Sequence, residues 1–364
     1  MNRVVQWIAG ASVAVVAITS AAVAQEILTR KYEPYYQTMF PISQAFGLEM
    51  LDARLRVVEA YATTPMNAEL KQHVASMATH DLGRFYGTLQ QRNAALATEL
   101  KTVVDAVAKA VLDGQPAAAM ATRARPLVAN AYNAVIDPAL RNNLQFKAAL
   151  MASMLMAEDG VSEAFEEAVK YPNRQQYPVG WGAWERVEVL WKELAEVATP
   201  ALRSEATLFM DNMRKFYQTK HLPPVPFPEE DQEELESLTH SMAALLESVA
   251  DATLFVGRDM PRVTKTLGEV VASICAEYAA GRDSLATERL YATLEHFVSE
   301  ASGVAGTLSV LAPETDARAR LLFSRLLVTR YKPPAGTPAT NMSAVDACRG
   351  LVTVMAEANK AVGG

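Results

Sequence analysis

Histidines and carboxylates at helical spacing are the first candidates for chemistry in this 364-residue chain. His73 and His80 are seven residues apart, so they can share one face of a helix, and Asp81 follows directly. Glu236 and His240 are four residues apart on another predicted helix. Neither spacing matches the His-Glu-x-x-His motif of zinc proteases or the Glu-x-x-His motif of di-iron bundles. We therefore interpret these histidines as surface or capping residues, and we predict no metal and no other cofactor.

Sequence motifs for phosphate binding and for acyl transfer are absent. The chain contains no G-x-x-x-x-G-K-[ST], no G-x-G-x-x-G and no G-x-S-x-G. No pairing of a nucleophile with a base is readable either, so we predict no catalytic residues, no small-molecule substrate and no enzyme activity. The net charge of −7 offers no basic surface, so no nucleic-acid partner is predicted.

An aromatic segment is the first candidate for an interaction surface. Three of the four tryptophans lie within a short stretch, and Trp181 and Trp184 are the candidates there for contact with lipid or with a protein partner. Tryptophan favours interfaces because its ring is apolar while its N–H can donate a hydrogen bond. The alternative is that this cluster fixes a loop onto a helix bundle.

A basic and apolar helix, expected over residues 317–332, is the second candidate surface. Arg318, Arg325 and Lys332 are seven residues apart and line up on one helical face among bulky apolar side chains. Such a face suits anionic lipid headgroups, at about 1 kcal/mol per charge near the surface. The alternative is a buried helix that carries a stripe of arginines, because the apolar residues spread around most of the helix.

Periodic apolar residues predict the helices that position these side chains. The stripes run with spacings of three and four along 48–62, 96–111, 235–256 and 290–311. Further helices are expected to open at Thr64-Pro65, Asp137-Pro138 and Thr199-Pro200, where an N-cap residue precedes a proline. No segment alternates with period two long enough to require a sheet. The predicted class is all-α, with antiparallel hairpins and bundles of about eight to ten helices.

Proline-rich segments predict the domain boundaries. Four prolines fall within 223–228, and further breaks lie at 171–182 and 331–338. We expect a helical subdomain over 26–222, a helical bundle over 229–330, and a proline-rich linker with a C-terminal helix over 331–364. Cys275 and Cys348 are the only cysteines. They could form one disulfide but no framework of several, and burial in the core is their expected role.

The N-terminal segment is the strongest signal in the chain. Residues 4–24 are almost purely apolar, and they would span about 30 Å as a helix, which is the thickness of a bilayer core. We expect residues 1–25 to be a single membrane anchor. The alternative is a signal peptide, because Ala22-Val23-Ala24 has the small-x-small form that a signal peptidase accepts.

Two short windows resemble the mitofilin family, the core subunit of the mitochondrial contact-site and cristae-organising (MICOS) complex. Leu112-Asp-Gly-Gln-Pro116 is similar to the Leu-x-x-Gly-x-Pro turn of that family, although Ala117 stands where the family has an aromatic residue. The stretch from Glu277 through Gly281 to Ala286 is similar to its helix, glycine turn and alanine-rich helix. The resemblance implies a compact, cristae-shaping subunit with its body in the intermembrane space.

Together these features predict a non-enzymatic helical scaffold at the mitochondrial inner membrane. Its expected partners are membrane lipids and other helical membrane-complex subunits. One alternative is an accessory structural subunit of a respiratory or ATP synthase complex. The other is an exported helical binding protein, periplasmic or secreted, if residues 1–24 are a cleaved signal peptide.

Overall fold

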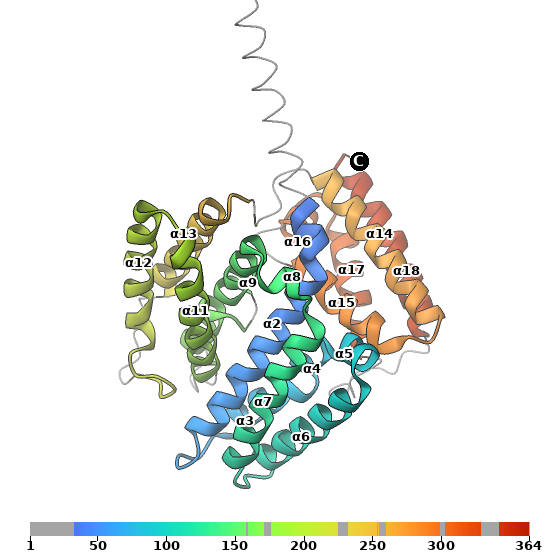
Figure 1. Ribbon diagram of the computed structural model, residues 1–364. Helices are drawn as coiled ribbons and strands as arrows, with labels where there is room; N and C mark the ends of the chain where they lie inside the picture. Colours follow the sequence, from blue (N-terminus) through green and yellow to red (C-terminus); the bar gives the residue numbers. More distant parts are fainter. Residues whose placement is uncertain are drawn as a thin grey trace, which may run out of the picture.

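The computed structural model describes residues 33–157, 159–170, 176–224, 232–252, 254, 260–298, 303–328 and 342–363 (Figure 1). All regular structure in these residues is helical, which confirms the predicted all-α class. The described helices run from α2 to α18, more than the eight to ten or so expected. The number is higher because several connections contain helices of only one or two turns.

The first hydrophobic core extends from Ile42 to Leu254. Its long helices are α2 (Glu33–Ala60), α6 (Ala94–Leu112), α7 (Ala118–Val135), α9 (Leu144–Met156), α11 (Tyr177–Val197), α12 (Pro200–Arg214) and α13 (Gln232–Ala250). Its short helices are α3 (Ala68–Ala75), η1 (Ser76–Ala78), α4 (His80–Gly83), α5 (Tyr86–Arg92), α8 (Pro138–Arg141), α10 (Val161–Lys170) and η2 (Lys215–Tyr217). Figure 1 shows α2 running through the middle of the molecule, where it packs against α4, α7, α9 and α11.

The second hydrophobic core extends from Val263 to Ala358. Its helices are α14 (Met260–Ala279), α15 (Asp283–Val298), α16 (Val304–Leu311), α17 (Pro313–Val328) and α18 (Ala344–Ala361). Helices α14 and α18 are antiparallel neighbours, because Asn359 bonds to Thr264 near one end while Cys348 meets Cys275 near the other. Helix α15 also packs against α2, α4 and α5, so it joins the second core to the first.

The two cores divide the chain at a different place from the predicted boundary. Helix α13 was expected to begin the second bundle, but it packs on α9, α10 and α12 within the first core. The division therefore falls between Leu254 and Met260, after α13 rather than before it. Prolines end a helix, but they do not prevent the next helix from folding back onto the preceding ones. Helix α13 folds back in this way and buries its apolar stripe in the first core. Likewise, α18 packs against α14 and α17 and is not a separate C-terminal unit.

Side-chain caps fix where several helices begin, and one predicted start was wrong. Thr199 caps α12 as predicted, with its hydroxyl accepting from Leu202 N at 3.4 Å. Thr64-Pro65 does not open a helix, because Asn67 caps α3 instead, accepting from Leu70 N at 2.7 Å. An asparagine side chain in this position satisfies one of the free N–H groups of the first turn, which stabilises the helix by about 1 kcal/mol.

Most described residues of the predicted apolar stripes are buried, although Leu311 is 59% exposed. Two of the predicted helices are too long. The stripes over 48–62 and 96–111 lie on α2 and α6, with Leu51 and Leu100 fully buried. The stripe over 235–256 loses its helix after Ala250, and the stripe over 290–311 is divided between α15 and α16. Gly303 precedes α16 with a left-handed φ of 66°, which a single continuous helix would not contain. The apolar periodicity of the sequence continues across this break because α15 and α16 both bury apolar side chains in the second core.

None of the described helices is both long enough and apolar enough to cross a membrane. The expected anchor at residues 4–24 lies outside the described residues, so that expectation stays a prediction. The first described helix is α2, which carries the central contacts of the first core.

Candidate functional site

A buried arginine on α2 holds two carboxylates that come from distant parts of the chain. Arg54 Nη1 contacts both carboxylate oxygens of Asp81 on α4, and Arg54 Nη2 donates to Asp159 Oδ2 at 2.7 Å. The side chains of Arg54 and Asp81 are 0% and 1% exposed. Burial alone would lower the pKa of Arg54, but the two carboxylates outweigh it and raise that pKa above its usual value. Since a buried charge is costly unless it is paired, each of these groups depends on the others.

Asp159 lies in the connection between α9 and α10 and presents its carboxylate to this site. Its φ of 68° is in the left-handed region, which aspartate tolerates better than most residues. Burial alone would raise the pKa of Asp159, but Arg54 and His80 hold it well below its usual value. The carboxylate is therefore ionised at neutral pH, and its side chain remains 11% exposed.

Two histidines face the carboxylate of Asp159 from two different helices. His80 Nε2 lies 3.3 Å from Arg84 Nη2, and because a guanidinium only donates, His80 carries its proton on Nδ1. That Nδ1 lies 3.5 Å from Asp159 Oδ2, and His73 Nε2 lies 3.5 Å from Asp159 Oδ1. Burial, aided by the charge of Arg54, lowers the pKa of His73 to about 4, so this ring is neutral at physiological pH.

A second buried arginine closes the cluster against aromatic rings. The guanidinium carbon of Arg84 is 5.0 Å from the ring centroid of Phe46 and 5.6 Å from that of Tyr291. The electron-rich faces of such rings attract a cation at this distance. Burial lowers the pKa of Arg84 below its ordinary value, although the nearby carboxylates oppose that shift. Tyr291 belongs to α15, so the second core contributes to a site that is otherwise built by the first.

A cavity of about 380 Å³ opens beside these groups. Such a volume lies within the range of about 300–1,000 Å³ that is usual for small-molecule sites. Among the described residues, the buried atoms His73 Nε2 and Gln176 Oε1 have no hydrogen-bond partner, and both residues line the cavity. The described lining consists of His73, Ser76, Thr79, His80, Asp159, Gln176 and Tyr291.

The described part of the chain contains no group of three or more histidine, cysteine or acidic side chains arranged to hold a metal ion. The reason at this site is that Arg54 already binds both carboxylates, with bonds to Asp81 and to Asp159. The described arrangement can accept hydrogen bonds from a small molecule.

Sequence analysis found part of this site and missed the rest. It picked out His73, His80 and Asp81, and the structure does bring these three together. The surface interpretation of His73 was wrong, since its side chain is only 13% exposed. Arg54 and Asp159 were missed because their pairing spans 105 residues. The Asp159-Gly160 dipeptide after the apolar run of α9 is the signal of a tight turn that could have marked the carboxylate.

The aromatic segment packs the first core instead of forming a large free surface. Trp184 is 2% exposed, so the prediction that it lies on a lipid or partner surface was wrong. Its position on the inner face of α11 explains this, because α11 packs against α2 and α9. Trp181 is half-buried, and its ring stacks edge-on against His221 with centroids 5.6 Å apart.

The arginine helix is α17, and it packs through its apolar side in the second core. Arg318 is 52% exposed and donates to Glu357 Oε2 at 2.8 Å, so a carboxylate already neutralises its charge. Arg325 is half-buried, and its Nη1 lies 4.0 Å from Met342 Sδ. Lys332 lies outside the described residues. This arrangement favours the alternative of a buried helix with an arginine stripe.

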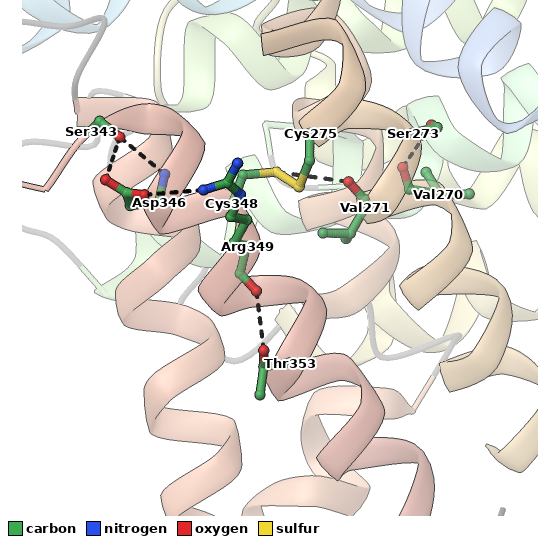
Figure 2. The surroundings of a disulfide bond; sticks show 9 residues. All are labelled: Val270, Val271, Ser273, Cys275, Ser343, Asp346, Cys348, Arg349 and Thr353. Carbon is green, nitrogen blue, oxygen red and sulfur yellow. Dashed lines mark hydrogen bonds and ion pairs between the residues drawn. A yellow bond between two sulfur atoms is a disulfide. The ribbon is translucent and has the colours of Figure 1, made fainter. Parts of the chain in front are cut away.

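A disulfide joins the two long helices of the second core. Figure 2 shows Cys275 on α14 bonded to Cys348 on α18, with their Cα atoms 5.5 Å apart. The sequence left open whether these two cysteines pair, and in the structure they form a disulfide between positions 73 residues apart. Ser343 caps α18 just before this bond, accepting from Asp346 N at 3.1 Å.

Comparisons with protein-family models, with curated proteins and with solved structures found no match for this chain.

Proposed function

We propose that the chain is a non-enzymatic helical scaffold that residues 4–24 hold at a membrane, with its body in an oxidising compartment. The observation that carries the proposal is the disulfide between Cys275 and Cys348. Disulfides persist in oxidising environments and are rare in the reducing cytosol. A disulfide-bonded body that follows an apolar segment of membrane-spanning length supports a protein exposed on the far side of a membrane.

The finer proposal is a subunit of a cristae-organising complex of the mitochondrial inner membrane, with its body in the intermembrane space. Its support is the order of anchor and helices, together with the two mitofilin-like windows that begin at Leu112 and at Glu277. In the structure, the first window ends α6 and contains Gly114 with a φ of 68°. The second ends α14 and contains Gly281 with a φ of 71°. Partners of this subunit would be membrane lipids and other helical subunits.

A second candidate function is an exported helical binding protein released by cleavage after Ala24. The cavity beside Asp159 favours it, because a pure scaffold does not need a polar cavity of about 380 Å³. An accessory structural subunit of a respiratory or ATP synthase complex remains the third alternative.

Alkaline carbonate extraction of the native protein, followed by thiol alkylation without reductant, tests the proposal. We expect the chain to stay in the membrane pellet and both cysteines to be protected until a reductant is added. Release of the uncleaved chain by carbonate would rule out the anchor. Free thiols in the native protein would remove the support for an oxidising compartment.

Two controls separate the anchor from the exported alternative. Sequencing the mature N-terminus distinguishes an intact Met1 from a chain that begins at Gln25. A Val15→Arg variant should insert poorly, since an arginine at the centre of a spanning helix costs about 2.5–3.5 kcal/mol. If the chain is intact and anchored, copurifying cristae-organising subunits would support the finer proposal over the accessory subunit.

A further inference from the structure

The cavity beside Asp159 presents hydrogen-bond acceptors to whatever occupies it. The carboxylate of Asp159 is ionised and can only accept hydrogen bonds. The hydroxyl of Ser76 donates its proton to His73 O at 2.7 Å, which leaves its lone pairs as acceptors. Gln176 Oε1 accepts no hydrogen bond within the described residues although it is buried. An acceptor of this kind can take a hydrogen bond from a ligand or from water.

The charged groups around the cavity are arranged so that a carboxylate, and not an arginine, faces it. Arg54 and Arg84 are both buried and do not line the cavity, whereas Asp159 is the one acidic side chain in the described lining. The rings of His73 and His80 line the same wall, and His73 is neutral. The ionised carboxylate of Asp159 would therefore repel an anion in the cavity and attract a cation. Tyr291 adds an aromatic ring to the lining, and its centroid lies 5.6 Å from the guanidinium carbon of Arg84.

A metal ion fits these groups less well than an organic cation does. Asp159 already accepts a hydrogen bond from Arg54, so a metal would have to displace that bond or share the oxygen with a buried guanidinium. A protonated amine instead keeps the bond and adds its own N–H donors. Three N–H groups match three acceptors that come from separate elements, namely Asp159, Ser76 and Gln176.

We propose that this cavity binds the ammonium group of a small primary amine, with Asp159, Ser76 and Gln176 as its acceptors and Tyr291 beside it. The site does not depend on whether residues 4–24 are retained. Carbonate extraction tests the anchor and amine binding tests the cavity, so either proposal can fail while the other stands.

Calorimetric titration of the full-length chain in detergent with propylammonium tests the proposal. We expect a dissociation constant of about 0.1–1 mM, which is near the limit for a ligand of so few atoms. Propionate and 1-propanol have the same carbon chain without the ammonium group and should bind at least tenfold more weakly. Tetramethylammonium carries the charge without any N–H donor and should also bind weakly. A titration into protein-free micelles corrects for partitioning.

Two variants identify the acceptors. Asp159→Asn should weaken propylammonium binding at least tenfold, but it also removes the negative charge that pairs with Arg54 and can destabilise the fold. Gln176→Leu avoids this problem, because Gln176 Oε1 accepts from no described protein donor, and it should weaken binding at least threefold. Gln218→Leu is the matched control, since Gln218 is exposed and its amide donates to Lys215 O three residues away. This control should bind as the native chain does.

Each alternative result overturns the proposal in a recognisable way. Equal binding of 1-propanol would show a site for neutral molecules, and preferred binding of propionate would show an anion site. Equal binding of tetramethylammonium would show that charge alone is recognised. If Gln176→Leu and Gln218→Leu both bind propylammonium as tightly as the native chain, the amine lies elsewhere. No heat from propylammonium at concentrations of about 10 mM would rule out the site.

Discussion

The backbone N–H of Thr88 donates to Glu288 Oε2 at 2.8 Å, and its hydroxyl donates to Oε1 at 2.7 Å, across 200 residues of chain. Thr88 lies on α5 in the first core, and Glu288 lies on α15 in the second. Gln44 on α2 donates to the same carboxylate. Glu288 is only 3% exposed, and burial raises its pKa although these donors oppose that shift. A buried carboxylate with donors from the opposite core thus links the two halves of the molecule.

Replacing Glu288 by leucine should destabilise the protein by about 2–4 kcal/mol, because the N–H and the hydroxyl of Thr88 would lose their acceptor and Gln44 would keep only Thr88 Oγ1. Urea denaturation followed by circular dichroism measures this loss. Glu236→Leu is the control, since Glu236 on α13 is 48% exposed, and its effect should stay within about 0.5 kcal/mol. Equal stability of both variants would show that the carboxylate does not connect the cores.

Gly87 marks a close backbone approach between the same two helices. A Cβ atom at Gly87 would lie 2.7 Å from the backbone N of Leu285 and from the backbone C of Ser284. Gly87→Ala should therefore push α5 away from α15 and cost about 1–3 kcal/mol in the free energy of unfolding.

Gly268→Ala is the matched control for this contact. Gly268 lies within α14, and a Cβ there would be 3.5 Å from Met355 Cβ, which is an ordinary van der Waals distance. Alanine is a better helix former than glycine, so this variant should be stabilised by up to about 1 kcal/mol. If Gly87→Ala were as stable as Gly268→Ala by urea denaturation, the close approach of α5 and α15 would be wrong.

Local chemistry explains which parts of the fold could be predicted from the sequence. Helix α6 could be predicted from its apolar stripe, and the start of α12 from Thr199-Pro200, because each of these signals acts within a few residues. The assignment of α13 to the first core could not be predicted in this way. Its stripe says that one face is buried, but it does not say which neighbouring helices cover that face.

The candidate site was less predictable because its members are brought together only by packing. Arg54 lies among the apolar residues of α2. A single charged residue there is normally predicted to lie on the surface, yet Arg54 is fully buried. Its partner Asp159 lies 105 residues away on a short connection. Pairwise spacing along one helix carries no information about such a contact. The disulfide likewise follows from the antiparallel packing of α14 and α18, which the sequence did not reveal.

Stability should fall as the pH is lowered from about 6.5 to 4, because burial lowers the pKa of both His73 and His296 to about 4. In this window the unfolded chain binds protons that the folded chain excludes, so the free energy of unfolding decreases with each proton. Each histidine contributes up to about 3 kcal/mol of this loss. The raised pKa of Glu288 acts in the opposite direction, since the folded chain then holds the extra proton.

Urea denaturation at a series of pH values measures this dependence. His296→Leu should flatten the slope by about one proton between pH 6 and 4.5, because leucine fills a buried position and does not titrate. An unchanged slope would mean that His296 is accessible to protons in the folded state.

Reduction of the disulfide between Cys275 and Cys348 should lower the free energy of unfolding by about 4 kcal/mol, because it releases a loop of 73 residues in the unfolded chain. The loss should fall mainly on the second core. The described tryptophans Trp181, Trp184 and Trp191 all lie on α11 in the first core, so their fluorescence follows that core, while circular dichroism follows both. Added reductant should therefore shift the dichroism transition more than the fluorescence transition. The double variant Cys275→Ser, Cys348→Ser should resemble the reduced protein and should not respond to reductant. If reductant shifts this variant too, or leaves the native chain unchanged, the bond between α14 and α18 does not stabilise the second core.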